Sequence, residues 1–244
     1  IRPGYAAGGA LDTAGSSIDV HALHRGYLNA FKTAGGTLIT DAQVRALERQ
    51  NQTWQIETAA GSFSTSVVIN ASGAWADKVA VKIGDNVPLT HSAPMLMITT
   101  RMPHFATPVV GAVSRPLSFK QFENGTVLIG GGAKGFADRD NNRTRLDYAK
   151  MAVGARNVVE FFPIMKTASV NRMWAGLEAY MPDNLPVIGK SVNADNAYHA
   201  FGFSAHGFQM GPIVGQVMAE LIIDGKSRFD LNKLRIDRFE RKVL

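Results

Sequence analysis

The sequence predicts a mixed α/β fold in which an antiparallel β-sheet is inserted into an α/β domain. At two places, 66–77 and 197–225, an apolar strand stops at small residues and runs into a helix pattern. Between residues 88 and 130 the pattern changes to short β-rich runs separated by turn residues. With 244 residues and 45% hydrophobic content, the chain can bury a substantial core.

The first part of the chain predicts a helix followed by short strands. Residues 1–17 are rich in Gly, Ala and Ser and predict a connecting segment. Apolar residues at three- and four-residue steps then indicate a helix that starts after Asp19 and ends at Gly35. We expect strands at 37–40, 42–47, 54–58 and 66–71, the last of them buried, and we expect them to contribute to a mostly parallel sheet.

The middle of the chain predicts the inserted sheet. Its expected strands are 94–100, 108–114, 117–121 and 126–130, with a hairpin turn at Glu123-Asn124-Gly125. A helix is expected over 144–162, because apolar residues recur there at helical spacing and Pro163 ends the run.

A glycine run at 130–135 satisfies the dinucleotide pattern G-x-G-x-x-G. In a nucleotide-binding unit that pattern opens a helix, whose N-terminus holds the pyrophosphate. Residues 136–142 are polar and turn-like instead. We therefore favour a loop that leaves the inserted sheet over an NAD-binding site.

The stretch 197–225 predicts a strand, a tight turn and a helix. The apolar run ends at Phe201, a turn of small residues covers 202–211, Pro212 is the expected first helical residue, and Gly225 ends the helix. Such a turn directs backbone N–H groups and the positive end of the helix dipole at whatever lies in front of it. That suits a phosphate or an electron-accepting ring, although many α/β proteins have ordinary turns of this kind.

Composition excludes several function classes. The net charge of +6 comes from scattered Lys and Arg residues without a basic, aromatic stripe, which argues against nucleic acid binding. The absence of Cys excludes disulfides and thiol chemistry, and no histidine spacing suggests a metal site. No apolar run reaches about 18 residues. We therefore expect no transmembrane span and a cytoplasmic location, with peripheral attachment to the inner membrane as an alternative.

The motifs together resemble the D-amino-acid oxidase-like superfamily of FAD-dependent amine oxidoreductases, such as glycine oxidase, D-amino-acid dehydrogenase, opine oxidases, hydroxyproline dehydrogenases and sarcosine oxidase β subunits. The motifs are VVINASGAWAD at 67–77, LSFKQFENGTVLIGGG at 117–132, MWAGLEAYMPDNLPVIG at 173–189 and HAFGFSAHGFQMGP at 199–212. The resemblance implies an FAD-binding domain of the glutathione-reductase-like type, made of 18–87 and 172–244. It also implies an antiparallel substrate domain at 88–171, with 1–17 as the connection from it.

The resemblance implies FAD as the cofactor and assigns residues to it. Val44 would meet the adenine side, and Ala71, Ser72, Gly73 and Trp75 would pass close to the cofactor. The remaining implied contacts, along the isoalloxazine ring and the ribityl chain, are Gly189, Gly207, Phe208, Gln209 and Met210.

The sequence departs from the family pattern in two places. It has no N-terminal strand, G-x-G-x-x-G turn and helix, so we expect a chain that begins inside a longer protein and retains FAD weakly. Where related enzymes place a carboxylate-binding Arg, this chain has Glu178, which would face an amine or lie in solvent. Other candidates to bind a substrate carboxylate are Arg115, Arg172 and Lys120.

The resemblance implies oxidation of the C–N bond of an amino acid or secondary amine by the complete protein, with this fragment inactive alone. The residues expected at the substrate are His206, Glu178, Tyr180 and Gln121. A packed, structural His206 is the alternative reading for that residue. The expected partners are a small amine or amino acid and other subunits of a heteromeric dehydrogenase. The alternative function is a non-catalytic, flavoprotein-like subunit of such a complex.

Overall fold

The computed structural model describes residues 1–239 and divides the chain into two compact units. Unit 1 contains Ile1–Ser17 and His91–Glu178, and unit 2 contains Ile18–Thr90 and Ala179 onward. Mixed α/β structure with antiparallel sheets agrees with the predicted fold class.

Unit 1 is built on a large antiparallel sheet. The strand order is β10-β9-β5-β8-β7-β6, and β11 and β12 also pair with β5. The strands are β5 (Thr90–Thr99), β6 (Val110–Gly111), β7 (Ser118–Gln121), β8 (Val127–Gly130), β9 (Lys134–Asp138), β10 (Arg143–Arg145), β11 (Val170–Ala175) and β12 (Glu178–Tyr180), of which β12 begins at the last residue of unit 1 and continues into unit 2. Because β5 alternates buried and half-buried residues from Ala93 to Thr99, one of its faces belongs to the core.

Helix α3 (Tyr148–Phe161) covers that core and is followed by the short helix η2 (Pro163–Thr167). Met151 and Val158 of α3 pack with Met97, Phe119 and Ile129 of the sheet. The helix begins four residues later than predicted, because Arg143–Arg145 pairs with β9 and the Asp147 side chain caps α3 by accepting from the Lys150 amide.

Unit 2 contains two three-stranded sheets. One is the antiparallel meander β1 (Val44–Gln50), β2 (Thr53–Thr58) and β3 (Gly61–Thr65). The other has the order β13-β14-β4, with β13 (Val187–Lys190), β14 (Ala197–Phe201) and β4 (Val68–Asn70). The helices are α1 (Val20–Thr33), α2 (Ala76–Ile83), α4 (Gly207–Ile223) and the short η1 (Gly73–Trp75), η3 (Asn232–Leu234) and η4 (Ile236–Phe239).

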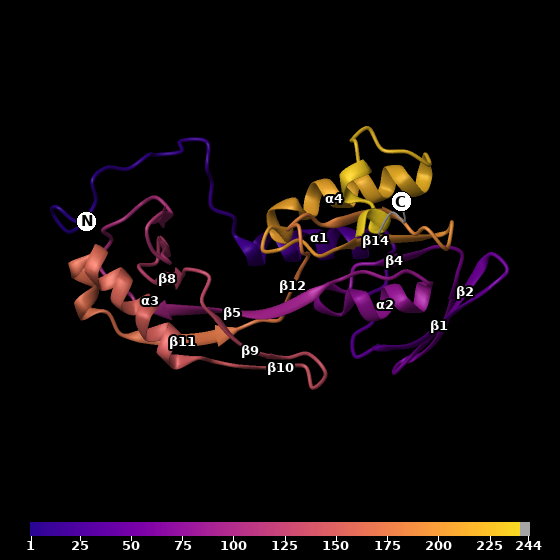
Figure 1. The fold of residues 1–244 in the computed structure, drawn as a ribbon, viewed down its shortest axis with the longest axis horizontal. Helices are drawn as coiled ribbons and strands as arrows, with labels where there is room; N and C mark the ends of the chain where they lie inside the picture. Colours follow the sequence, from indigo (N-terminus) through magenta and orange to yellow (C-terminus); the bar gives the residue numbers. More distant parts are fainter. Residues whose placement is uncertain (240–244) are drawn as a thin grey trace. The chain divides into compact units, whose positions relative to one another are not determined.

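Helices α2 and α4 lie on opposite faces of the β13-β14-β4 sheet (Figure 1). Alternation along β14 explains this layering, because neighbouring side chains of a strand point to opposite faces. Tyr198 and Ala200 pack with α4, whereas Ala197 and Phe201 belong to the clusters that contain α2 residues. His199 therefore points to the α2 face.

Several predictions about these elements are wrong. Residues 37–40 form no strand, and Leu38 and Ile39 are exposed instead of pairing with a neighbour. The expected buried strand at 66–71 is only half-buried: Ile69 is 46% exposed and the polar Asn70 is the buried residue. The sheet is also not mostly parallel. The β4–β14 pair is parallel, and the other pairs whose register is described are antiparallel.

The glycine run at 130–135 behaves as predicted in one respect. It leaves β8 and enters β9, so no helix follows it. The expected polar turn is partly wrong, because 136–138 extends β9 before the chain turns at 139–142.

Candidate functional site

The candidate site lies at the edge of the sheet where β4 and β14 end. These two strands run parallel, so their carboxyl ends meet at the same edge. Open α/β sheets bind ligands outside such carboxyl ends. The residues that follow are the β4 turn (residues 71–75) and the β14 turn (residues 202–206), and each leads into a helix, α2 and α4 respectively.

Asn70 holds the β4 turn in place. Its side chain is 2% exposed, and its Oδ1 accepts from the Ser72 amide at 3.3 Å and from Ser72 Oγ at 2.5 Å. Its Nδ2 donates to the Ala76 carbonyl at 2.8 Å, at the start of α2. The asparagine thereby ties both ends of the turn to the last residue of β4.

A cavity of about 270 Å³ opens beside this turn. It brings together three residues predicted to contact the cofactor, Val44, Ala71 and Ser72. The other lining residues are mostly apolar: Leu47, Ile56, Thr65, Val67, Val68, Ile69, Asn70 and Val79. Gly73 and Trp75 form η1 directly after this cavity lining. A flat, weakly polar group of a ligand suits such walls.

The β14 turn has strained backbone that is held by hydrogen bonds of Ser204. Ser204 and Ala205 both have left-handed φ values, 49° and 74°, which L-residues seldom adopt. Ser204 is buried. Its Oγ accepts from the Met181 amide at 3.1 Å, and its own amide donates to the Ala179 carbonyl at 3.3 Å. Strained residues of this kind cluster at binding sites and switch regions.

Helix α4 begins at Gly207, so the prediction that Pro212 is its first residue is wrong. The residues Gly207 to Met210 are the first turn of the helix and not a loop. The amides of 207–209 still lack intrahelical acceptors at the helix N-terminus, where the dipole is positive, whereas the Met210 amide donates to the His206 carbonyl at 3.3 Å. His206 is the N-cap residue, is exposed, and makes no side-chain capping bond.

A buried pair of Asp85 and His199 was missed by sequence reasoning. The two side chains are 1% and 0% exposed, and His199 Nε2 lies 2.7 Å from Asp85 Oδ2. Burial lowers the pKa of His199, although Asp85 opposes the shift. Burial alone would raise the pKa of Asp85, but hydrogen bonds from Ser191, His199 and Asn193 hold it below its usual value. The pair is therefore a neutral imidazole beside a carboxylate.

The other predicted substrate residues lie on two strands, β12 and β7. Glu178 and Tyr180 are two positions apart on β12, so they share a face of that strand, and both are half-buried. Gln121 is in unit 1 and is 4% exposed. Its amide accepts from the backbone of 105 and 106 and donates to the carbonyls of 103 and 125. This arrangement favours a structural role for Gln121.

The remaining predicted contacts have mixed surroundings. Gly189 is buried within β13 and pairs with His199. In α4, Phe208 and Gln209 are exposed and Met210 packs against the sheet. The Arg115 guanidinium bonds to Glu160 at 3.1 Å and to the Tyr5 hydroxyl, so a substrate carboxylate would have to compete with Glu160.

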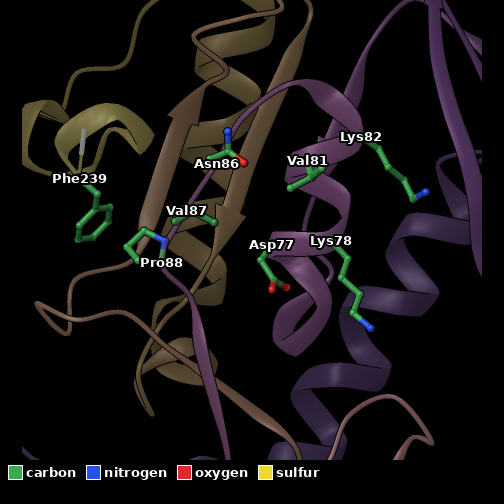
Figure 2. Close-up of a pocket in the computed structure, with 8 residues that line it drawn as sticks. All are labelled: Asp77, Lys78, Val81, Lys82, Asn86, Val87, Pro88 and Phe239. Carbon is green, nitrogen blue, oxygen red and sulfur yellow. The ribbon is translucent and has the colours of Figure 1, made fainter. Parts of the chain in front are cut away.

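A larger cavity of about 660 Å³ contains none of the predicted site residues (Figure 2). Asp77, Lys78, Val81 and Lys82 of α2 form one wall, and 86–88 with Phe239 form the other. Lys82 donates to the Arg45 carbonyl at 2.8 Å. Within residues 1–239, no cluster of three or more His, Cys, Asp or Glu side chains could hold a metal ion. Nor does any helix in that range combine the length and apolar character that crossing a membrane requires.

The family model described as FAD dependent oxidoreductase (DAO) matches residues 1–221. The chain belongs to this family. It is 27% identical over 242 residues to hydrogen cyanide synthase subunit HcnC of Pseudomonas aeruginosa, covering 97% of this chain and 56% of HcnC. It is 25% identical over 241 residues to sarcosine oxidase subunit beta of Rhizobium meliloti, again covering 97% of this chain and 56% of the relative.

The fold agrees with solved structures of the family. L-Proline dehydrogenase from P. horikoshii superposes with a TM-score of 0.83 at 26% identity, covering 91% of this chain and 60% of that enzyme. The chain thus spans little more than half the length of these relatives. The resemblance deduced from sequence motifs, to FAD-dependent oxidoreductases acting on amino acids or amines, is confirmed.

Proposed function

We propose that the complete protein oxidises the C–N bond of an amino acid or a secondary amine with FAD. The observation that carries the proposal is the cavity beside the β4 turn, where Val44, Ala71 and Ser72 share one lining. The family resemblance assigns all three to the cofactor, although they are far apart in the sequence.

The residues at this sheet edge fit parts of FAD. The cavity of about 270 Å³ has mostly apolar walls that suit one portion of the dinucleotide. The first-turn amides of α4 suit an electron-accepting ring that gains negative charge on reduction, because the positive end of the helix lies there. The cofactor, when bound, supplies a flavin that accepts a hydride from the carbon beside the substrate nitrogen. Gly207, Phe208, Gln209 and Met210 would orient that ring.

The two units suggest a division of labour. We propose that 18–87 and 172–244 belong to a glutathione-reductase-like FAD-binding domain, and that 88–171 bind substrate, with 1–17 connecting them. No G-x-G-x-x-G run in this chain opens a helix within residues 1–239. Because that unit grips the pyrophosphate in dinucleotide-binding folds, the 244-residue chain should retain FAD weakly and show no turnover.

We propose that Glu178 and Tyr180 face the substrate with His206. A carboxylate at Glu178 favours a cationic amine, since opposite charges attract most strongly where water is excluded. Gly73, Trp75 and Gly189 would support the cofactor through backbone and packing contacts. Gln121 would not contact the substrate itself but would fix the backbone at 103–106 through its hydrogen bonds.

A heteromeric assembly is part of the proposal. Two of the relatives, HcnC and sarcosine oxidase subunit beta, are subunits by name. This supports other subunits as partners and keeps open the alternative of a non-catalytic, flavoprotein-like subunit. We propose a cytoplasmic location, with peripheral contact to the inner membrane as its variant.

Flavin binding and reduction test the proposal. The complete protein should purify with bound flavin, and anaerobic addition of sarcosine or L-proline should bleach its visible absorption. Ser72→Trp should fill the cavity and weaken FAD binding at least tenfold, whereas Ser62→Trp, an exposed control on β3, should not. A complete protein that neither contains nor takes up flavin would overturn the proposal. Flavin that binds but is never reduced by a panel of amines would favour the non-catalytic alternative.

A further inference from the structure

Four polar side chains form an unbroken chain of hydrogen bonds through the α2 face of the β13-β14-β4 sheet. Asp85 Oδ2 lies 2.7 Å from His199 Nε2, and His199 Nδ1 lies 3.4 Å from Asn70 Nδ2. Asn70 Oδ1 then meets Ser72 Oγ at 2.5 Å. The first three residues are buried, and Ser72 is half-buried at the cavity beside the β4 turn. The chain therefore runs from the interior of unit 2 to a cavity wall.

The direction of each hydrogen bond follows from one fixed donor. The Ser72 backbone amide can only donate, so the Asn70 atom that faces it must be the carbonyl Oδ1. Asn70 Nδ2 then faces the Ala76 carbonyl and His199 Nδ1, so Nδ1 must accept. A neutral imidazole carries its proton on the other nitrogen, and His199 Nε2–H therefore donates to Asp85.

Asp85 anchors the buried end of this chain. Its Oδ1 accepts from Asn193 Nδ2 at 2.8 Å, and the same Asn193 amide reaches the Gly84 carbonyl at 2.8 Å. Because an ionised carboxylate can only accept, Asp85 Oδ2 accepts from His199 Nε2. The lowered pKa values of Asp85 and His199 agree with this charge state, because they keep the acid ionised and the imidazole neutral.

At the cavity end, the same hydrogen bonds decide whether Ser72 can donate to a ligand or only accept from it. Both donors of Ser72, its N–H and its O–H, are used by Asn70 Oδ1. Only lone pairs of Ser72 Oγ remain for a ligand. If Asn70 rotated by half a turn, its NH₂ group would face the Ser72 N–H, so that bond would be lost and the Ser72 hydroxyl would have to accept instead of donate.

We propose that Asp85, His199 and Asn70 are positioning residues that hold Ser72 Oγ as a hydrogen-bond acceptor for a hydroxyl group of the bound cofactor. That the cofactor occupies the cavity rests on the proposed function. The direction of the hydrogen bonds does not depend on it, because it follows from the donors and acceptors of these residues alone.

The tautomer of His199 tests the direction without any substitution. In ¹⁵N-labelled chain at neutral pH, long-range ¹H–¹⁵N spectra should show the His199 ring protonated at Nε2 and unprotonated at Nδ1. A ring protonated at Nδ1, or at both nitrogens, would overturn the proposal, because Asn70 Nδ2 could then not donate to it.

The variant Asn70→Asp tests the coupling between the residues. A carboxylate at position 70 can only accept, so His199 would have to donate from both nitrogens and become an imidazolium. The ¹⁵N shifts should report this change at neutral pH. The matched control Asn171→Asp, at an exposed position of β11, should leave the His199 signals unchanged. An unchanged neutral tautomer in folded Asn70→Asp would contradict the coupling. If that variant fails to fold, the spectrum of the unsubstituted chain still decides.

FAD titration of the complete protein separates this inference from the proposed function. If the unsubstituted protein binds FAD, Ser72→Ala should weaken binding about tenfold, the loss expected for one hydrogen bond. Ser66→Ala, at an exposed position beside β4, should bind like the unsubstituted protein. Equal affinity in Ser72→Ala would overturn the acceptor role while the proposed function stands. If no FAD binds, both the proposed function and the hydrogen bond to a cofactor hydroxyl are wrong. The His199 spectra then test the series of hydrogen bonds from Asp85 to Ser72 by themselves.

Discussion

The β4 turn and the β14 turn both connect a strand to a helix, but different interactions hold them in place. Each follows one of two parallel neighbouring strands and leads into a helix at the same edge of the sheet. Side chains fix the β4 turn, through Asn70 and the buried partners behind it. The β14 turn has left-handed backbone at 202, 204 and 205 and depends on Ser204, whose amide donates to the carbonyl of 179 and whose hydroxyl accepts from the amide of 181.

The difference teaches how each turn can fail. The β4 turn is supported by titratable side chains, His199 and Asp85, behind the Asn70 amide, so protonation can loosen it. The hydrogen bonds of Ser204 to 179 and 181 involve no titratable side chain, but the left-handed residues of the β14 turn make it sensitive to any change in φ preference. Substitutions at the two turns should therefore separate cleanly.

Removing Asn70 should have the largest effect. Asn70→Ala leaves the Ser72 donors, the Ala76 carbonyl and His199 Nδ1 without their partner in a buried site. We expect a loss of about 3 kcal/mol in the free energy of unfolding, measured by urea titration. Asn171→Ala, at an exposed site, should change it by less than about 0.5 kcal/mol. Equal losses in both variants would show that the amide is not the support of the β4 turn.

Gly202→Ala should damage the β14 turn by about 2 kcal/mol. Gly202 has φ 72°, and a Cβ there would lie 2.6 Å from Met181 Cγ. Gly225 has the same φ of 72° but open space around a Cβ, so Gly225→Ala isolates the backbone cost of about 1 kcal/mol. The difference between the two variants in urea titration measures the clash. A Gly202→Ala loss no larger than that of Gly225→Ala would rule out close packing as the constraint.

Acid should loosen the β4 turn selectively. Because burial lowers the pKa of His199, this imidazole is protonated below about pH 6.5 in the unfolded chain but stays neutral in the folded chain. The free energy of unfolding should therefore fall, by about 1 kcal/mol, between pH 7.5 and 5.5. Asp85, with its lowered pKa, adds a further loss only nearer pH 4.

Amide hydrogen exchange locates this acid effect. Exchange corrected for its intrinsic pH dependence should accelerate at 71–73 and not at 203–206. His199→Gln should flatten the dependence of stability on pH in the same window. A slope that survives in His199→Gln would assign it to other groups.

Ala205→Gly should have the smallest effect and the opposite sign. Glycine relieves the cost of φ 74° but increases the entropy of the unfolded chain. The net gain should be about 0.5 kcal/mol, seen as a higher thermal midpoint. Ala219→Gly, at an exposed position inside α4, should instead lose about 1 kcal/mol. A loss in both variants would show that the left-handed residue is not strained.

Local sequence patterns predicted most elements but not the polar interior. Helix α1 follows from its Asp19 cap and helical spacing, and the hairpin β7–β8 follows from its Asn124-Gly125 turn. The start of α4 could not be read in the same way. Pro212 looks like a first helical residue, yet the helix tolerates it six positions in, after an N-terminus that the β14 turn dictates.

For a related reason, the sequence predicted only some residues of the candidate site. Ala71 and Ser72 stand out as small residues after an apolar strand, and the structure gathers them with Val44. Asp85 and His199 are 114 positions apart, so no local spacing reveals their contact. The available signals were weak: a polar Asn at the end of VVIN and a His inside the apolar run AYHAF.

The proline inside α4 gives the first turn of that helix mechanical independence. Pro212 has no N–H, so the Phe208 carbonyl has no donor four residues ahead, and the ring crowds that carbonyl. One hydrogen bond fewer therefore joins the first turn to the rest of the helix. Pro212→Ala would restore a donor for the Phe208 carbonyl and should tie the amides of 207–209 more firmly to the helix body.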